Sequence, residues 1–256
     1  PTYSSVSNLL QANVITYDLD ENNNWQPDFE ALEQLDLSNV KLMWVNYPNM
    51  PTGASATPEL FEKLVAFGKK HGIVICNDNP YSFILNDNHL SILQVKGAKE
   101  ICIELNSMSK SHNMPGWRMG MLASNAQFVE WILKVKSNID SGQFKPMQMA
   151  AIAALNNSEE WHNEMNINLY KNRRHLAEEI MKSLGCTFDP HQVGMFLWGK
   201  IPDQYKDSAE LADIARPFIF RKYLDFGAIN AMRDLHAQIR REVMRKDMVD
   251  HIKLGP

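Results

Sequence analysis

The sequence predicts an α/β protein with a mostly parallel central sheet and helices on both faces. Short apolar, β-branched segments that each run into polar residues indicate buried parallel strands. Helical segments with apolar residues three and four positions apart alternate with these strands, the order that a parallel sheet requires. A chain of 256 residues can bury a large core, and its length allows one or two domains.

Three strands are expected in the first half of the chain, and a polar cluster follows each of them. The strands cover residues 42–46, 73–77 and 101–105, and the clusters are Asn49 with Thr52, Asp78 with Tyr81, and Ser107 with Lys110. Open α/β sheets bind their ligands at the carboxyl ends of the strands. The three clusters are therefore candidates for a ligand site. A further short strand is expected over residues 119–122.

Four helices are expected, over residues 57–72, 126–139, 147–155 and 161–184. The first has clear end signals, because Thr57 can cap its start, Pro58 suits its first turn and Gly72 ends it. The second carries apolar residues on one face, at Phe128, Trp131, Ile132 and Val135. The last is long enough to join a large domain to a smaller one.

Residues 107–120 are the most informative stretch, because they set Lys110 between serines, with Arg118 eight residues further on. Serine hydroxyls can donate to phosphate oxygens, and an arginine can hold them with two hydrogen bonds. A lysine amine attacks carbon only when it is deprotonated, a form that desolvation and a neighbouring cation favour. The stretch alone fits a solvated loop as well. The strand clusters around it favour a lysine used for covalent chemistry beside a bound phosphate.

Three motifs in this order resemble the fold type I enzymes that use pyridoxal 5'-phosphate (PLP), in particular the aspartate aminotransferase-like class I/II aminotransferases. They are Y-P-N-x-P-T-G from Tyr47, D-x-x-Y from Asp78, and S-x-S-K-x-x-x-x-x-G-W-R-x-G from Ser107, with Met50 at the open position of the first. The resemblance implies a large PLP-binding domain over residues 1–165. It also implies a linking helix and a small C-terminal α+β domain over residues 166–256.

The resemblance also implies a role for each site residue. Lys110 would form the internal aldimine with PLP and move the substrate proton, and Asp78 would pair with the pyridinium nitrogen. Tyr81 would hydrogen-bond the phenolic oxygen of PLP, while Ser107 and Arg118 would bind its phosphate. The physical properties of these side chains agree with each assignment.

The first motif departs from the family pattern at Met50, where most relatives have an asparagine that bonds the phenolic oxygen. A methionine side chain has no donor, so either Asn49 takes this role or the role is vacant. Pro1 to Ser5 resemble the segment that follows the aromatic residue stacked on PLP in relatives. We therefore expect the chain as given to begin inside the large domain.

The C-terminal part matches the family pattern least. Residues 194–202 resemble the first strand of the small domain, and residues 208–213 resemble the helix after it. Residues 218–220 and 226–230 are the nearest counterpart of a strand that carries the arginine for the substrate carboxylate, but alanine stands at that place. Arg221 and Arg233 flank it out of register, so no residue is assigned to this role.

The implied function is an aminotransferase of amino acid metabolism, which moves an amino group from an amino acid to a 2-oxo acid in two half-reactions. Two alternatives stay open. One is β-elimination on the same scaffold, and the other is a non-catalytic aminotransferase-like module that senses a ligand. The presence of both Lys110 and Asp78 argues against the non-catalytic module, because a protein that no longer catalyses this reaction would not need both residues. Relatives are homodimers, so a homodimer is expected.

Composition excludes several other classes of protein. A formal charge of −4 and a pI near 6.1 indicate no nucleic-acid partner. No apolar run reaches the roughly 20 residues of a membrane span. The three cysteines and eight histidines show no metal-ligand spacing, so no metal is expected. His112 is expected to be a packing or loop residue. The odd cysteine count argues against a disulfide framework and fits a cytoplasmic protein.

Overall fold

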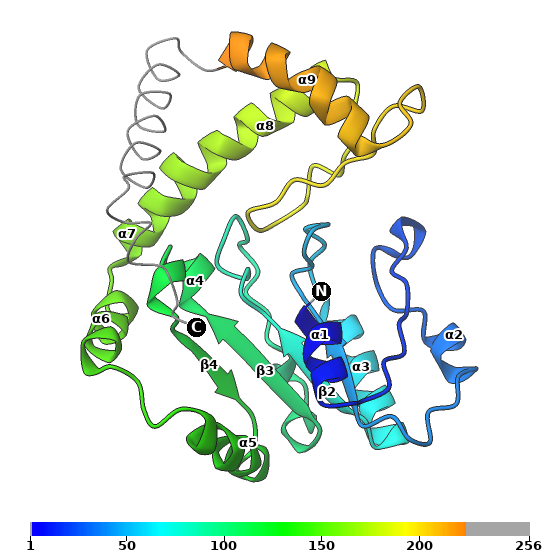
Figure 1. Ribbon diagram of the computed structural model, residues 1–256, viewed down its shortest axis with the longest axis vertical. Coiled ribbons are helices and arrows are strands. Elements are labelled where there is room, and N and C mark those ends of the chain that lie inside the picture. Colours follow the sequence, from blue (N-terminus) through cyan, green and yellow to red (C-terminus); the bar gives the residue numbers. More distant parts are fainter. Residues whose placement is uncertain (1, 224–256) are drawn as a thin grey trace, which may run out of the picture. The chain divides into compact units, whose positions relative to one another are not determined.

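The computed structural model describes residues 2–223 and contains a four-stranded sheet (Figure 1). The strands lie in the order β1-β2-β3-β4. They span Leu42–Val45, Val74–Asp78, Cys102–Ser107 and Gly120–Ala123. All four expected strands are present within one or two residues of their predicted limits. The first three run parallel, whereas β4 runs antiparallel to β3.

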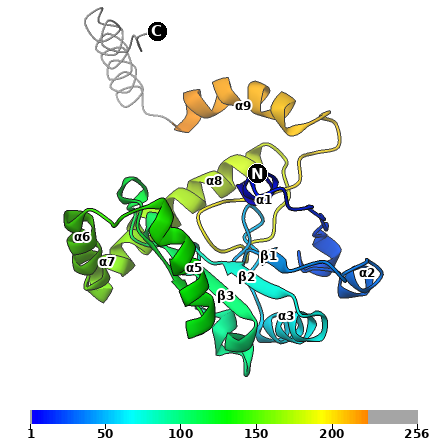
Figure 2. The same cartoon turned by 60° about the horizontal axis from the view of Figure 1, so that its bottom comes forward.

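Helix α3 (Pro58–His71) confirms the predicted start and end signals. The side chain of Thr57 accepts a hydrogen bond from the backbone N–H of Leu60, and Gly72 adopts φ +65° after the last turn. Its apolar face packs along the sheet (Figure 2), where Leu60, Phe61 and Leu64 are almost fully buried. These side chains and those of β1 and β2 form the main hydrophobic core.

The remaining helices include those expected over residues 126–139, 147–155 and 161–184, together with short helices near the start of the chain and after β3 that the sequence analysis did not predict. They are α1 (Thr2–Leu9), α2 (Phe29–Glu33), α4 (Met108–Ser111), α5 (Ala126–Ile139), α6 (Lys145–Leu155), α7 (Glu159–Glu164), α8 (Asn172–Ser183) and α9 (Ser208–Tyr223). The long helix expected over residues 161–184 is present in three parts, because a π-helical segment, Met165–Lys171, separates α7 from α8. Among residues 2–223, no helix is long and apolar enough to cross a membrane.

Helix α5 has the predicted limits but does not bury its apolar face. None of its residues is buried, and Trp131 and Val135 are 57% and 61% exposed. The sequence pattern predicted the amphipathic helix correctly. It could not show which surface of the protein covers the apolar stripe, because that depends on contacts between distant parts of the chain.

The chain divides into two compact units. The first comprises residues 1–178 with 188–199, and the second comprises 179–187 with 200–256. In the second unit the helix expected at residues 208–213 is the first part of α9. The strand expected over residues 194–202 is wrong, because only Lys200 takes part in a bridge, to Thr187. Residues 218–220 are helical rather than extended, and residues 226–230 lie outside the described part of the chain.

The two cysteines of the sheet make the stability of this protein sensitive to alkaline pH. Burial raises the pKa of the Cys76 and Cys102 thiols to about 12, whereas an unfolded thiol titrates near pH 8.5. The folded state therefore holds more protons above about pH 8.5, and stability falls as pH rises towards 12. We expect a loss of roughly 2.5–3 kcal/mol per thiol by about pH 10.5.

Urea unfolding between about pH 7.5 and 10.5 checks this prediction, with the Cys76→Ala/Cys102→Ala protein as the comparison. The variant should lose less unfolding free energy than the parent over this range. If the unfolding free energy of both proteins changed equally with pH, the result would contradict the prediction.

Candidate active site

The carboxyl ends of β2 and β3 bring the predicted site residues into one region of the first unit. Asp78 is the last residue of β2, and Ser107 is the last residue of β3. The two strands are neighbours, with Asp78 in register with Leu105. Helix α4 continues directly from β3 (Figure 1) and carries Lys110 in its single turn. Asp78 and Lys110, 32 positions apart, thus follow the ends of adjacent strands.

Asp78 is a half-buried carboxylate with one hydrogen-bond donor and no ion-pair partner among residues 2–223. The hydroxyl of Tyr3 donates to Oδ2 of Asp78 at 2.6 Å. No lysine, arginine or histidine of residues 2–223 forms an ion pair with this carboxylate. A carboxylate taken from water normally keeps a charged or hydrogen-bonding partner. Asp78 is therefore suited to receive a cationic N–H group from a ligand.

Tyr3 is a site residue that the sequence analysis did not identify. Its ring stacks on Trp44 with centroids 4.7 Å apart and an angle of 11° between the planes. Burial, together with the hydrogen bond to Asp78 and the charge of that carboxylate, raises the pKa of Tyr3 above its usual range. Tyr3 therefore stays a neutral donor. No local sequence signal could have found this contact, because it joins residues 75 positions apart.

Lys110 lies in a helix of only one turn that Ser107 caps. The Oγ atom of Ser107 accepts a hydrogen bond from the backbone N–H of Ser109 at 3.1 Å. Lys110 itself is partly exposed. Within residues 2–223 no hydrogen bond or ion pair engages its amine, which leaves the nitrogen available to a ligand.

The segment with Arg118 returns beside the start of α4. The backbone N–H of Met108 donates to the carbonyl of Met119 at 3.1 Å. Gly120 pairs with Ser107, and a Cβ atom at this glycine would lie 2.8 Å from the carbonyl oxygen of Asn106. Only glycine fits so close to the neighbouring strand. The exposed guanidinium of Arg118 donates to the carbonyl of Pro115 at 2.9 Å.

Asn49 is buried in the turn after β1, and both ends of its amide are engaged there. Its Nδ2 donates to the carbonyl of Asn46 at 3.3 Å, and its Oδ1 accepts from the hydroxyl of Thr52 at 2.7 Å. Asn46 bridges to the next strand, because its Nδ2 donates to the carbonyl of Asp78 at 2.6 Å. Met50 is 43% exposed. A cofactor role for Asn49 stays a prediction, and it would require the turn to release part of this amide.

Tyr81 is buried against a loop from much later in the chain. Its ring meets Phe196 edge-on at 5.6 Å between centroids. Burial and the charge of Asp78 raise the pKa of Tyr81. The guanidinium of Arg174 holds the loop by donating to the carbonyls of Gln192, Gly194 and Phe196.

Gly53, the last residue of the first motif, forms the other contact with this loop. The backbone N–H of Val193 donates to the carbonyl of Gly53 at 2.9 Å. Gly53 has φ +70°, and a Cβ atom there would lie 2.7 Å from Cβ of Gln192. We expect Gly53→Ala to lower the free energy of unfolding by about 2–4 kcal/mol, through backbone strain and overpacking.

Urea denaturation measures this loss of stability. Gly116→Ala is the matched control, because a Cβ atom at Gly116 meets no atom within 4 Å. A Gly53→Ala protein as stable as the Gly116→Ala protein would show that the loop contact is looser than the structure indicates.

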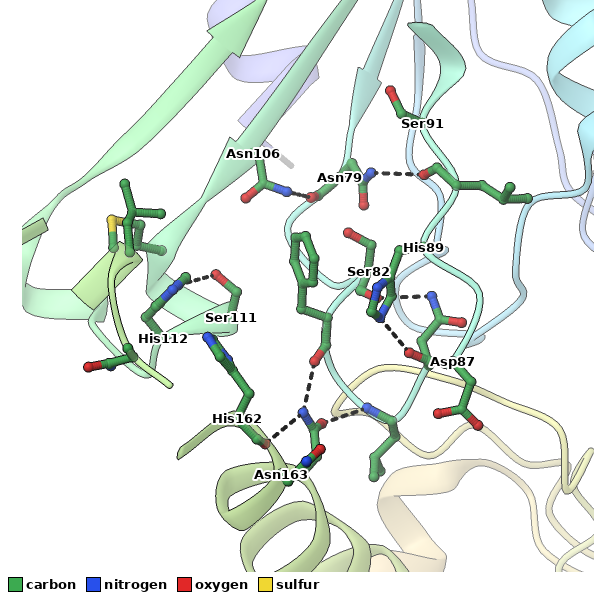
Figure 3. Close-up of a pocket in the computed structure, with 18 of the residues that line it drawn as sticks. Asn79, Ser82, Asp87, His89, Ser91, Asn106, Ser111, His112, His162 and Asn163 are labelled. Atoms are coloured by element: carbon green, nitrogen blue, oxygen red, sulfur yellow. Dashed lines mark hydrogen bonds between the residues drawn. The ribbon is translucent and has the colours of Figure 1, made fainter. Parts of the chain in front are cut away.

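A cavity of about 1510 Å³ lies on another side of α4. Met108, Ser111 and His112 line it, whereas Asp78, Tyr81 and Lys110 do not. Figure 3 shows Ser111, His112 and His162 on one side of this cavity and Asn79 with Asn106 on another. The cavity is therefore separate from the predicted cofactor site, although both border the same short helix.

The residues at the strand ends fit PLP on two observations. Within residues 2–223, Asp78 has a hydrogen-bond donor but no ion pair, and the amine of Lys110 has no partner. A pyridinium N–H and an aldehyde carbon are groups that would satisfy them. The open α/β sheet is that of the PLP-dependent transferases of fold type I.

The chain belongs to the aminotransferase class I and II family, whose model matches residues 1–243. Members of this family depend on PLP. The LL-diaminopimelate aminotransferase of Dehalococcoides mccartyi is 39% identical over 211 residues, which are 82% of this chain and 54% of that protein. The LL-diaminopimelate aminotransferase of Gloeobacter violaceus is 44% identical over 72% of this chain and 47% of its own length.

Among solved structures, the probable N-succinyldiaminopimelate aminotransferase of Thermus thermophilus superposes with a TM-score of 0.76 at 28% identity. The match covers 84% of this chain and 58% of that one. The chain thus spans about half the length of the curated relatives it matches.

Proposed function

We propose that the protein containing this chain is a PLP-dependent aminotransferase, which moves an amino group from an amino acid to a 2-oxo acid. The observation that carries the proposal is the pair formed by Asp78 and Lys110. A half-buried carboxylate without a cation and an amine without a partner in the described chain follow the ends of neighbouring strands. Membership of the aminotransferase family supports the same conclusion.

Each residue has a distinct task in the proposed reaction. Bound PLP supplies a ring that withdraws electrons from the substrate α-carbon. Lys110 binds the cofactor covalently and then moves the proton of that carbon. Asp78 keeps the pyridine nitrogen protonated. The hydroxyl of Tyr3 donates a hydrogen bond to Oδ2 of the Asp78 carboxylate. Tyr81 donates to the phenolic oxygen of the cofactor, and Ser107 and Arg118 hold its phosphate.

The relatives and the thiols support proposals for the substrate, the assembly and the location. Two relatives are named LL-diaminopimelate aminotransferases, so LL-diaminopimelate is the first amino donor to test. We propose a homodimer, as in enzymes of this family. Cys76, Cys102 and Cys186 are all free thiols, which supports a reducing compartment such as the cytoplasm.

The visible absorption spectrum with PLP tests the proposed function. We expect a band that requires Lys110 and that LL-diaminopimelate, or another amino acid of a panel, converts to the spectrum of the aminated cofactor. A band that no amino acid converts would contradict transamination. Release of ammonia and pyruvate from the substrate would favour β-elimination instead.

Tyr3→Phe is expected to weaken PLP binding by at most about 10-fold, because Asp78 then loses the hydrogen bond that orients its carboxylate, a bond of roughly 1.5–3 kcal/mol that the protein already makes without cofactor. The phenyl ring can keep its stacking on Trp44, so the change removes little except the donor to Asp78. Fluorescence titration with PLP gives the dissociation constant. Tyr17→Phe is the matched control, since the Tyr17 hydroxyl donates to a backbone carbonyl, that of Trp44, at 2.6 Å. Equal affinities for the two variants would rule out this role of Tyr3.

A further inference from the structure

Helix α4 cannot hold its own shape, because it has only the four residues Met108–Ser111. A single turn gains too few backbone hydrogen bonds to offset the entropy of ordering it. The cap from Ser107 stabilises its start. Its end, which carries Lys110, must be held by side chains of the surrounding structure.

The side chain of Ser111, at the end of α4, forms a hydrogen bond with the residue that caps the start of this helix. The side chain is buried, with 1% of the residue exposed. Its Oγ donates to the carbonyl of Ser107 at 3.1 Å and lies 2.8 Å from Nδ1 of His112. A hydroxyl has one hydrogen, which goes to Ser107, so the hydrogen in the second contact belongs to Nδ1 of His112. This network assigns the Nδ1–H tautomer to His112.

His112, the residue after α4, packs its ring against two side chains of α7. Its ring stacks on Trp161 with centroids 6.0 Å apart and an angle of 19°, and it meets His162 edge-on at 5.2 Å. Burial, and secondarily the charge of His162, lowers the pKa of His112. His112 and His162 line one cavity (Figure 3), and Glu159 of α7 is also among its lining residues. The His112 ring thus lies between the end of α4 and α7, where burial disfavours its charged form.

We propose that Ser111 and His112 are positioning residues that hold α4 against α7 and so fix the direction of the Lys110 amine. Neither side chain has to touch the cofactor for this effect. The Ser111 hydroxyl stabilises the turn of α4 through its bond to the carbonyl of Ser107, and the His112 ring packs this turn against Trp161 of α7. The proposal rests on the proposed function only in that Lys110 is the residue to be positioned.

The first experiment measures hydrogen–deuterium exchange of the amides of residues 107–114 in the purified protein without added cofactor. We expect Ser111→Ala and His112→Phe to speed this exchange about five- to tenfold, because each removes a buried hydrogen bond. The Phe ring keeps the stacking on Trp161 and loses only the donor. Ser137→Ala is the control, because it removes a similar bond to the carbonyl of Lys134 in exposed helix α5. Unchanged exchange in both test variants would overturn the proposal.

The second experiment measures how fast PLP becomes fixed to Lys110 by borohydride, with the site located by peptide mass. Both variants should slow fixation and shift its pH profile, while circular dichroism shows that the fold is retained. Ser111→Thr, which keeps the hydroxyl, should restore the rate. Faster exchange with a normal fixation rate would also overturn the proposal, because α4 would then be loosened without effect on Lys110. If the parent protein fixes no PLP at Lys110, the proposed function fails, while the exchange result still decides whether the two residues hold α4.

Discussion

Lys110→Ala is expected to abolish the reducible covalent attachment of PLP to the protein while the fold stays intact. The amine of Lys110 has no hydrogen bond or ion pair within residues 2–223, so its removal breaks no described contact. Alanine is also the residue that a helix such as α4 accepts most readily. Borohydride reduction followed by mass measurement detects the attachment, and circular dichroism monitors the fold.

Two further variants separate loss of the nucleophile from loss of positive charge. Lys110→Arg keeps the charge but cannot form the bond, and it should behave like Lys110→Ala. Lys96→Ala removes an exposed lysine outside the site and should leave attachment unchanged. Attachment that survives in both Lys110 variants would exclude this residue as the one that binds PLP.

Asp78→Ala is expected to lower turnover on the order of 10²–10³-fold, the loss typical of removing one preorganised polar group from an active site. The phosphate contacts proposed for Ser107 and Arg118 and the covalent bond proposed for Lys110 do not involve this carboxylate, so PLP affinity should fall less than turnover. Measuring kcat together with the PLP dissociation constant distinguishes the two effects. The pKa of Tyr3 should fall in this variant, because the carboxylate is among the causes that raise it.

Asp87→Ala provides the matched control for the second prediction. Asp87 is an exposed carboxylate nine residues further along the chain. Its removal should change neither turnover nor affinity. An Asp78→Ala protein with near-normal turnover would show that the carboxylate does not maintain the protonated ring.

The predicted elements agree with the structure where the local pattern is strong. Thr57, Pro58 and Gly72 gave the limits of α3 to the residue, because capping and glycine conformations act within one turn. The strands were found from short β-branched runs, and their limits moved by only one or two residues. The strand expected at residues 194–202 failed for the opposite reason, since its pairing depends on a distant partner.

The sequence by itself determined the family, the α/β class and the placement of Asp78 and Lys110 at the ends of successive strands. These follow from residue type and spacing along the chain. Only the tertiary structure placed Tyr3 on Asp78, engaged Asn49 in its turn and joined Ser111 through His112 to α7. Two of these contacts, Tyr3 with Asp78 and His112 with Trp161, join residues far apart in sequence. Their geometry is set by packing, which no local pattern encodes.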